Sequence, residues 1–131
     1  MNISLGRTVL LVKDYDEALR FYRDVFGARI LFDQDSNFGL RFLHIALGND
    51  THGIWLLKAE NREERIRVGQ QTADQPALVL YTDDLAACYR HMKLKNVTIK
   101  LEPATNPVYS FFHCLDLYGN ELVIVQLAGE N

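Results

Sequence analysis

The chain repeats its own pattern at an interval of 68 to 70 residues. An Asp precedes each of two helix-like stretches, a Gly or Asn follows it, and a His lies within a later apolar run. The matching pairs are Asp14 and Asp84, Gly27 and Asn96, His44 and His113, and Trp55 and Val123. Self-similarity at a fixed interval indicates two copies of one supersecondary unit. We therefore expect two similar modules.

The first module has the order strand, helix, strand, strand, strand. Residues 7–13 (RTVLLVK) are aliphatic and too few for a typical helix, which predicts a buried strand. Asp14 and Glu17 form an acidic variant of the capping box, apolar residues recur at helical spacing from Ala18 to Phe26, and Gly27 follows the helix end. Three further strand-like runs cover residues 29–33, 40–47 and 53–58.

The second module repeats this order. Residues 77–82 predict a strand, Asp83 or Asp84 a helix cap, and Asn96 the left-handed residue after the helix. Strands are predicted at residues 97–101, 109–115 and 121–126. The polar stretch from Ala59 to Gln75 lacks a sustained strand pattern and precedes Pro76, so it is interpreted as the connection.

These patterns predict an α+β fold with two βαβββ modules in one chain. Each module should form a curved four-stranded mixed sheet with one covering helix, and the sheet faces left uncovered should form a cleft. We expect a single domain over residues 1–131, with module one at 1–58, the linker at 59–76 and module two at 77–131.

Composition limits the classes of partner. The chain has 131 residues, 48% of them hydrophobic, which suits one compact domain with a real core. Its net charge of -3 and its lack of a Lys/Arg cluster argue against nucleic acid and anionic membranes as partners. Neither a signal peptide nor a membrane span is recognisable, so we expect a cytoplasmic protein. Cys88 and Cys114 are expected to be reduced thiols between helix and sheet of the second module.

Three segments are informative about the family of the chain, namely VKDYDEALRFYRDVFGA, LVLYTDDLAACYRHMKLKNV and LDLYGNELVIV. They resemble the vicinal oxygen chelate superfamily, which includes the glyoxalase, bleomycin-resistance and extradiol-dioxygenase proteins. In the last segment Leu117 and Tyr118 stand where the family usually has Pro and Asp. The resemblance covers nearly the whole chain and implies the same two-module fold. It leaves open lyases such as lactoylglutathione lyase, dioxygenases and non-catalytic drug binders.

The resemblance also places a metal site that this sequence does not fit. Metal-dependent members hold a divalent ion with His, Glu or Gln on the first and last strands of each module. The matching residues here are Arg7, Trp55, Ala77 and Val123. None offers a usual ligand atom, because a guanidinium stays protonated and the other three side chains lack a suitable donor. We therefore expect no metal and no cofactor.

Strand alternation predicts which residues line the cleft, because side chains two apart share a face. We expect the following residues to bind the ligand: Arg7, Phe42, His44, Trp55, Tyr81, Phe111 and His113. The histidines would hydrogen-bond a ligand or transfer protons, the arginine would hold an anion, and the rings would stack on a planar molecule. The alternatives are histidines satisfied by their neighbours, an arginine that reaches solvent, and rings that pack in the core.

Two functions remain open at this point. The favoured one is a metal-independent small-molecule-binding protein of the bleomycin-resistance type, which holds an aromatic or amphipathic compound in an apolar cleft. The other is a lyase or dioxygenase whose displaced metal site uses His44, His113 and an unidentified carboxylate. The resemblance also implies a homodimer, since small members of the family commonly pair.

Overall fold

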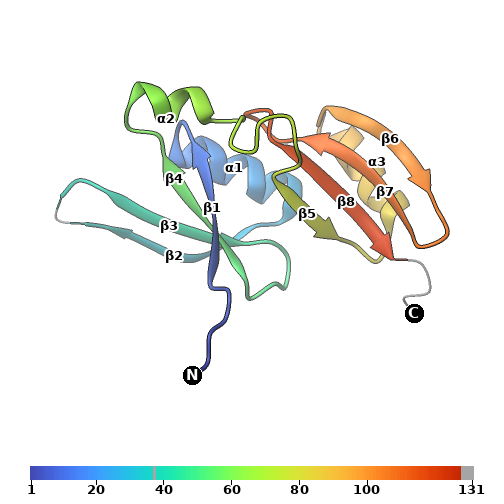
Figure 1. Ribbon diagram of the computed structural model, residues 1–131, viewed down its shortest axis with the longest axis horizontal. Coiled ribbons are helices and arrows are strands. Elements are labelled where there is room, and N and C mark those ends of the chain that lie inside the picture. Colours follow the sequence, from blue (N-terminus) through green and yellow to red (C-terminus); the bar gives the residue numbers. More distant parts are fainter. Residues whose placement is uncertain (37, 128–131) are drawn as a thin grey trace. The chain divides into compact units, whose positions relative to one another are not determined.

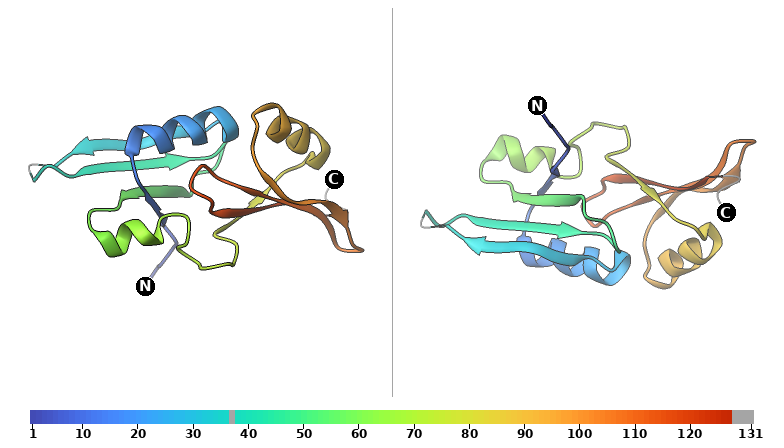
Figure 2. Two further views of the ribbon diagram at one scale, coloured as in Figure 1. Left: turned by 90° about the horizontal axis from the view of Figure 1, so that it is seen from above. Right: turned by 90° about the horizontal axis from the view of Figure 1, so that it is seen from below.

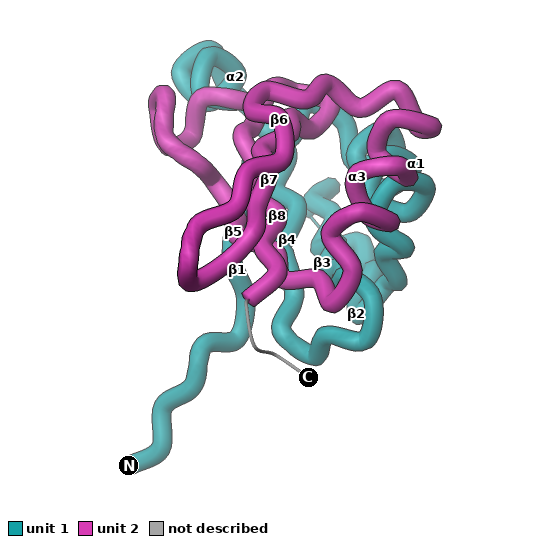
Figure 3. The backbone as a smooth tube through the Cα atoms, turned by 90° about the vertical axis from the view of Figure 1, so that its right-hand side faces the viewer, with its two compact units in different colours: residues 1–68 teal, residues 69–131 magenta. Residues whose placement is uncertain are grey.

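The computed structural model describes residues 1–36 and 38–127. The chain divides into two compact units, which comprise residues 1–68 and 69–131 (Figure 3). Each unit contains one four-stranded sheet and one longer helix. None of the helices among the described residues has the length and apolar character needed to cross a membrane.

The first unit is built on a mixed sheet with the strand order β1-β4-β3-β2 (Figure 1). Its strands are β1 (Arg7–Val12), β2 (Arg29–Asp35), β3 (Arg41–Ala46) and β4 (Gly53–Lys58). β1 runs parallel to β4, and the other neighbours are antiparallel. The parallel pairing requires a crossover, which contains helix α1 (Tyr15–Phe26).

Helix α1 begins and ends at the predicted residues. Asp14 Oδ2 accepts a hydrogen bond from the Glu17 amide at 2.8 Å, and Gly27 adopts the left-handed conformation at φ 65°. The helix covers one face of the sheet (Figure 2). Its buried residues are Ala18, Leu19, Tyr22 and Val25, and the buried strand residues are Leu10, Val12, Leu43, Ile45, Ala46, Gly53, Ile54 and Leu56.

A short helix that the sequence analysis did not predict follows β4. Helix α2 (Arg62–Arg67) lies within the stretch interpreted as a plain connection. Asn61 Oδ1 accepts from the Glu64 amide at 2.9 Å, while Glu64 Oε1 accepts from the Glu60 amide at 2.8 Å. This reciprocal arrangement resembles a capping box. None of the six helical residues is buried, so the sequence has no apolar stripe that would predict the helix.

The second unit repeats the first, with the strand order β5-β8-β7-β6. Its strands are β5 (Leu78–Tyr81), β6 (Ile99–Thr105), β7 (Tyr109–Leu115) and β8 (Glu121–Leu127), and its helix is α3 (Leu85–Leu94). Asp84 caps this helix by accepting from the Ala87 amide at 3.0 Å, and Asn96 is left-handed at φ 59°. The α+β fold with two βαβββ modules is therefore confirmed.

Strand β6 extends further than predicted. The sequence pattern predicted a strand that ends at Leu101, whereas the strand continues through Pro103 to Thr105. A proline lacks the N–H that a central strand needs, but β6 is an edge strand and its pairing shifts between Leu101 and Ala104. The edge position therefore tolerates Pro103 within the strand.

Both cysteines are free thiols in the second unit, as predicted. Cys114 is fully buried with Phe112, Leu122 and Ile124 on the side of the sheet that faces α3. Cys88 is half-buried on α3. Burial, with smaller contributions from the nearby Cys88 and Asp116, raises the pKa of Cys114 to about 12. Its thiol is therefore protonated and inert at neutral pH.

Candidate functional site

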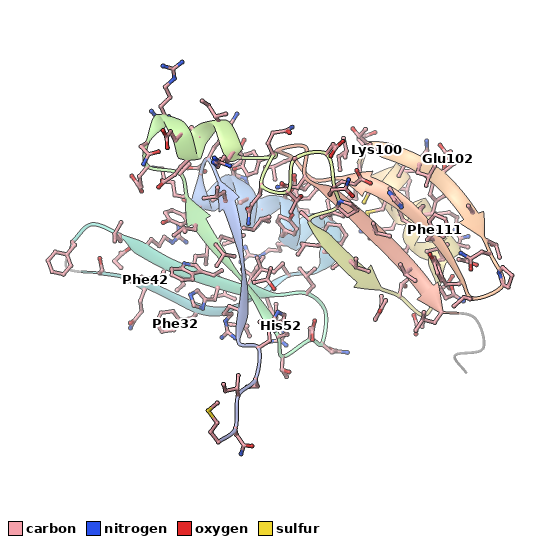
Figure 4. All side chains as sticks on the ribbon, in the orientation of Figure 1. Phe32, Phe42, His52, Lys100, Glu102 and Phe111 are labelled. Atoms are coloured by element: carbon pink, nitrogen blue, oxygen red, sulfur yellow. The ribbon has the colours of Figure 1, made fainter. Side chains whose placement is uncertain are left out.

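The face of the first sheet that α1 does not cover is called here the donor face. Four residues predicted to bind the ligand lie on it, namely Arg7, Phe42, His44 and Trp55, and all four are half-buried. They share the face because each alternates along its strand with residues buried under α1. Phe32 of β2, which the sequence analysis did not single out, joins them and is 43% exposed. Figure 4 labels Phe32 and Phe42 on the neighbouring strands β2 and β3.

The rings on the donor face form one continuous aromatic row. His44 is paired with Trp55 across β3 and β4, and with Phe32 across β2 and β3. The ring centroids of His44 and Trp55 lie 5.4 Å apart, those of Phe32 and His44 5.5 Å, and those of Phe42 and Trp55 6.3 Å. These spacings lie in the range of favourable ring contacts. The row therefore offers an aromatic surface of mutually tilted rings, with polar atoms set into it.

Arg7 fixes the protonation of His44. Its Nε donates a hydrogen bond to His44 Nδ1 at 3.1 Å, and its Nη1 donates to the Gly6 carbonyl at 2.8 Å. Because a guanidinium only donates, His44 Nδ1 must be the unprotonated nitrogen, and neutral His44 carries its proton on Nε2. Burial, and then the charge of Arg7, lowers the pKa of His44. His44 is therefore a neutral ring with one N–H to donate.

Trp55 holds a further donor on this face. Its indole Nε1 is buried and has no hydrogen-bond partner among the described residues. A buried N–H without an acceptor costs about 1 to 3 kcal/mol, so an unsatisfied group in a native structure calls for an explanation. Together with Arg7 and His44, Trp55 gives the aromatic row three hydrogen-bond donors, of which the indole N–H lies beneath the surface.

Gly53 provides the space that Arg7 occupies. The two residues are paired across β1 and β4. A Cβ atom at position 53 would lie 3.1 Å from Arg7 Cδ, 2.8 Å from the Ile45 carbonyl oxygen and 2.6 Å from Leu31 Cδ1. Any side chain there would therefore clash with the Ile45 carbonyl and with Leu31, and would crowd the Arg7 side chain that contacts His44.

The face of the second sheet that α3 does not cover is called here the acceptor face. It carries the remaining predicted residues, Tyr81, Phe111 and His113. The rings of Phe111 and His113 lie 5.8 Å apart, and His113 is paired with Val123 (Figure 4 labels Phe111). Tyr81 lies on the edge strand β5 and is 75% exposed. The alternative that Tyr81 packs in the core is therefore wrong.

Glu121 is the polar partner of His113, and the sequence analysis missed it. The carboxylate lies 2.6 Å from His113 Nδ1 through Oε2 and 2.6 Å from Lys100 Nζ through Oε1. The hydrogen bond from Lys100 is the largest cause that lowers the pKa of Glu121, and the one from His113 adds to it. An ionised carboxylate only accepts, so His113 donates from Nδ1 and its Nε2 keeps a lone pair in the neutral ring.

The residues at the metal positions of the family do not fit a divalent cation. Arg7 presents a positive charge, Trp55 presents an N–H, and Ala77 and Val123 present only hydrocarbon. Within residues 1–36 and 38–127, no group of three or more His, Cys, Asp or Glu side chains is arranged to hold a metal ion. His113 and Glu121 engage each other and Lys100 instead.

Two βαβββ units that repeat one another, each with a helix on one side of its sheet, define the vicinal oxygen chelate class of proteins. The chain belongs to the Glyoxalase/Bleomycin resistance protein/Dioxygenase superfamily, whose family model matches residues 4–124. The resemblance found in the sequence is thereby confirmed.

Several relatives match nearly the full length of the chain. An uncharacterised protein of Shewanella frigidimarina (strain NCIMB 400) is 27% identical over 129 residues, which cover 97% of this chain and 96% of that protein. The crystal structure of UcmS2 has a TM-score of 0.83 at 21% identity and covers 95% of this chain and 98% of its own. TnmS3, an antibiotic binding protein from Streptomyces sp. CB03234, has a TM-score of 0.80 at 24% identity, with 98% and 99% covered.

Proposed function

We propose that this protein is a metal-independent small-molecule-binding protein that holds an aromatic or amphipathic ligand on its donor face. The observation that carries the proposal is the buried, unpartnered Nε1–H of Trp55. It lies in the same aromatic row as His44 and Phe42. A ligand oxygen would satisfy this donor, and the neighbouring rings would pack against the flat part of the ligand.

The charge of this face favours an anionic ligand. Arg7 supplies a permanent positive charge, and His44 supplies a neutral N–H through Nε2. Neither group accepts a proton from a ligand at neutral pH, because the guanidinium is already protonated and His44 Nδ1 is engaged by Arg7. The donor face therefore suits an aromatic carboxylate or a similar planar anion.

The comparisons support the binding class without naming the ligand. TnmS3 is an antibiotic binding protein, and its structure matches this chain over nearly its whole length. The metal-dependent lyase or dioxygenase gains no support from the residues at the family's metal positions, which lack ligand atoms. Binding without a metal is the function that the donor face supports best.

Fluorescence of Trp55, the only tryptophan, tests the proposal with 4-nitrobenzoate as the probe. The nitrobenzoate should quench Trp55 emission saturably in protein treated with a chelator. Arg7→Gln should weaken the binding of 4-nitrobenzoate by about 1 to 3 kcal/mol. The same substitution should have little effect on the binding of the neutral methyl 4-nitrobenzoate. Trp55→Phe keeps the ring but removes the N–H, so calorimetry should show weaker binding of both probes.

Arg20→Gln is the matched control, because Arg20 is an exposed residue of α1 and not of the donor face. It should leave the affinity for 4-nitrobenzoate unchanged. Binding that leaves Trp55 emission unaltered and is insensitive to Arg7→Gln would contradict the proposed face. Elemental analysis that finds about one Zn, Ni, Mn or Fe per chain would contradict metal independence.

A further inference from the structure

The acceptor face carries a group that the proposed function does not use. His113, Glu121 and Lys100 form a chain of three polar side chains on β7, β8 and β6. Figure 4 labels Lys100 on β6 and Phe111 on the adjacent β7. The side chains of His113 and Glu121 are 21% and 11% exposed, so both are largely shielded from water.

Each member of the chain fixes the state of the next. Lys100 Nζ donates to Glu121 Oε1 at 2.6 Å and thereby favours the ionised carboxylate. Glu121 Oε2, 2.6 Å from His113 Nδ1, then accepts the proton of that nitrogen. The remaining ring nitrogen, Nε2, has no protein partner among the described residues. A carboxylate behind an imidazole stabilises the imidazolium that forms when Nε2 gains a proton.

Apart from Glu121 and Lys100, the residues around His113 on the acceptor face are apolar. Val123 and Leu101 are its partners on the neighbouring strands, and Phe111 lies two residues before it on the same face. Leu101 is 43% exposed, and Val79, which is paired with Val123, is 59% exposed. A flat ring can therefore lie against this face with a polar group directed at His113.

We propose that His113, oriented by Glu121, accepts the proton of a weakly acidic hydroxyl group carried on the flat ring of a ligand. The O–H bond breaks, its electron pair stays on the ligand oxygen, and the proton forms a new bond to His113 Nε2. The imidazolium is then held between the ligand oxyanion and the Glu121 carboxylate. This inference extends the proposed function to a second ligand chemistry and rests on different residues.

The test uses 4-nitrophenol, whose anion absorbs visible light and whose protonated form does not. At a pH at which the free probe is mostly protonated, the wild-type protein should produce the nitrophenolate band. His113→Gln and Glu121→Gln should each abolish most of this band. Nitrogen-15 NMR should show Nε2 of His113 becoming protonated when the probe binds, and Glu121→Gln should change the ring nitrogen that carries the proton in the free protein.

His91→Gln is the matched control, since His91 lies on α3, on the opposite side of the second sheet from the acceptor face. It should leave the nitrophenolate band intact. A band that survives His113→Gln but disappears in Arg7→Gln would overturn the inference, because the donor face would then have stabilised the anion. Thermal unfolding by circular dichroism identifies any variant that fails to fold. Binding of 4-nitrobenzoate is measured separately, so failure of one proposal is distinguishable from failure of the other.

Discussion

The two units place a histidine at the same position and surround it with opposite charges. His44 is paired with Trp55, and His113 is paired with Val123, two matching positions of the repeat. The partner of His44 is a cation from the first strand of its unit, whereas the partner of His113 is an anion from the last strand. One repeat has therefore produced two different environments for the same side chain.

At two matching positions, the two units exchange a charged residue and a small one. Arg7 is paired with Gly53 in the first unit, and the equivalent residues in the second are Ala77 and Glu121, whose backbones are joined by a hydrogen bond of 2.8 Å. In each unit a long charged residue lies beside a small one, but on the opposite strand. The arginine makes its histidine a hydrogen-bond donor, and the glutamate leaves its histidine a free acceptor. The polarity of each face thus depends on which strand contributes the charge.

The largest effects on stability are expected on the sheet faces that pack against the helices, where the two units are alike. Leu43 and Phe112 are equivalent, fully buried and directed to the helix. Leu43→Ala and Phe112→Ala should each lower the free energy of unfolding by about 3 to 5 kcal/mol, because each leaves a cavity under a helix. Urea unfolding followed by circular dichroism measures this. His44→Gln and His113→Gln are the controls, and losses as large as those of the core variants would show that the faces are wrongly assigned.

A smaller effect on stability is expected from Glu121, and this effect should depend on pH. Glu121→Gln should cost about 1 to 2 kcal/mol at neutral pH, because a charge that receives two hydrogen bonds is lost. The pKa of Glu121 is lowered from its ordinary value of 4.5 in the folded protein. Its contribution is therefore complete above that value and is lost as the pH falls through the folded-state pKa. Unfolding measured between pH 7 and 3 should show the difference between wild type and variant shrinking below 4.5; a constant difference would argue against an ionised Glu121.

The smallest effect concerns the ionisation of His44. Burial is the larger cause of its lowered pKa and the charge of Arg7 the smaller, so Arg7→Gln should raise the pKa only partway toward 6.5. The folded protein favours neutral His44, so this contribution to stability is lost as the pH falls from 6.5 toward the folded-state pKa. NMR titration of His44 measures the shift. An unchanged pKa in Arg7→Gln would mean that Arg7 does not govern the ring.

Much of this arrangement was predictable from the sequence. The repeat indicated the order of elements, because Asp14 and Gly27 recur as Asp84 and Asn96 around each helix. Alternation along the strands then placed Arg7, His44 and His113 on faces that the helices leave uncovered. Successive side chains of a strand point to opposite faces of the sheet, so buried and uncovered residues alternate. These patterns are local, and the sequence expresses them directly.

Side-chain contacts between strands were harder to predict from the sequence. Glu121 lies two residues before Val123 and so shares the face of His113, which was a usable signal. Its bond to His113 also depends on the rotamers of both side chains and on Lys100, which local patterns do not encode. Helix α2 escaped notice because it buries no residue, although Asn61 and Glu64 have the spacing of a capping box. The unpartnered Nε1 of Trp55 follows from packing alone.

Gly53 also bears on how the two halves of the chain can evolve. A Cβ atom at this position would lie 2.8 Å from the Ile45 carbonyl oxygen, a backbone atom of the adjacent strand that cannot yield without disturbing the sheet. A glutamate at position 53, which matches the position of Glu121 in the second half, would therefore force the sheet backbone to shift. The second half can lose its glutamate without a comparable steric barrier. At this position the two halves can therefore become alike more easily by loss of Glu121 than by gain of a glutamate at position 53.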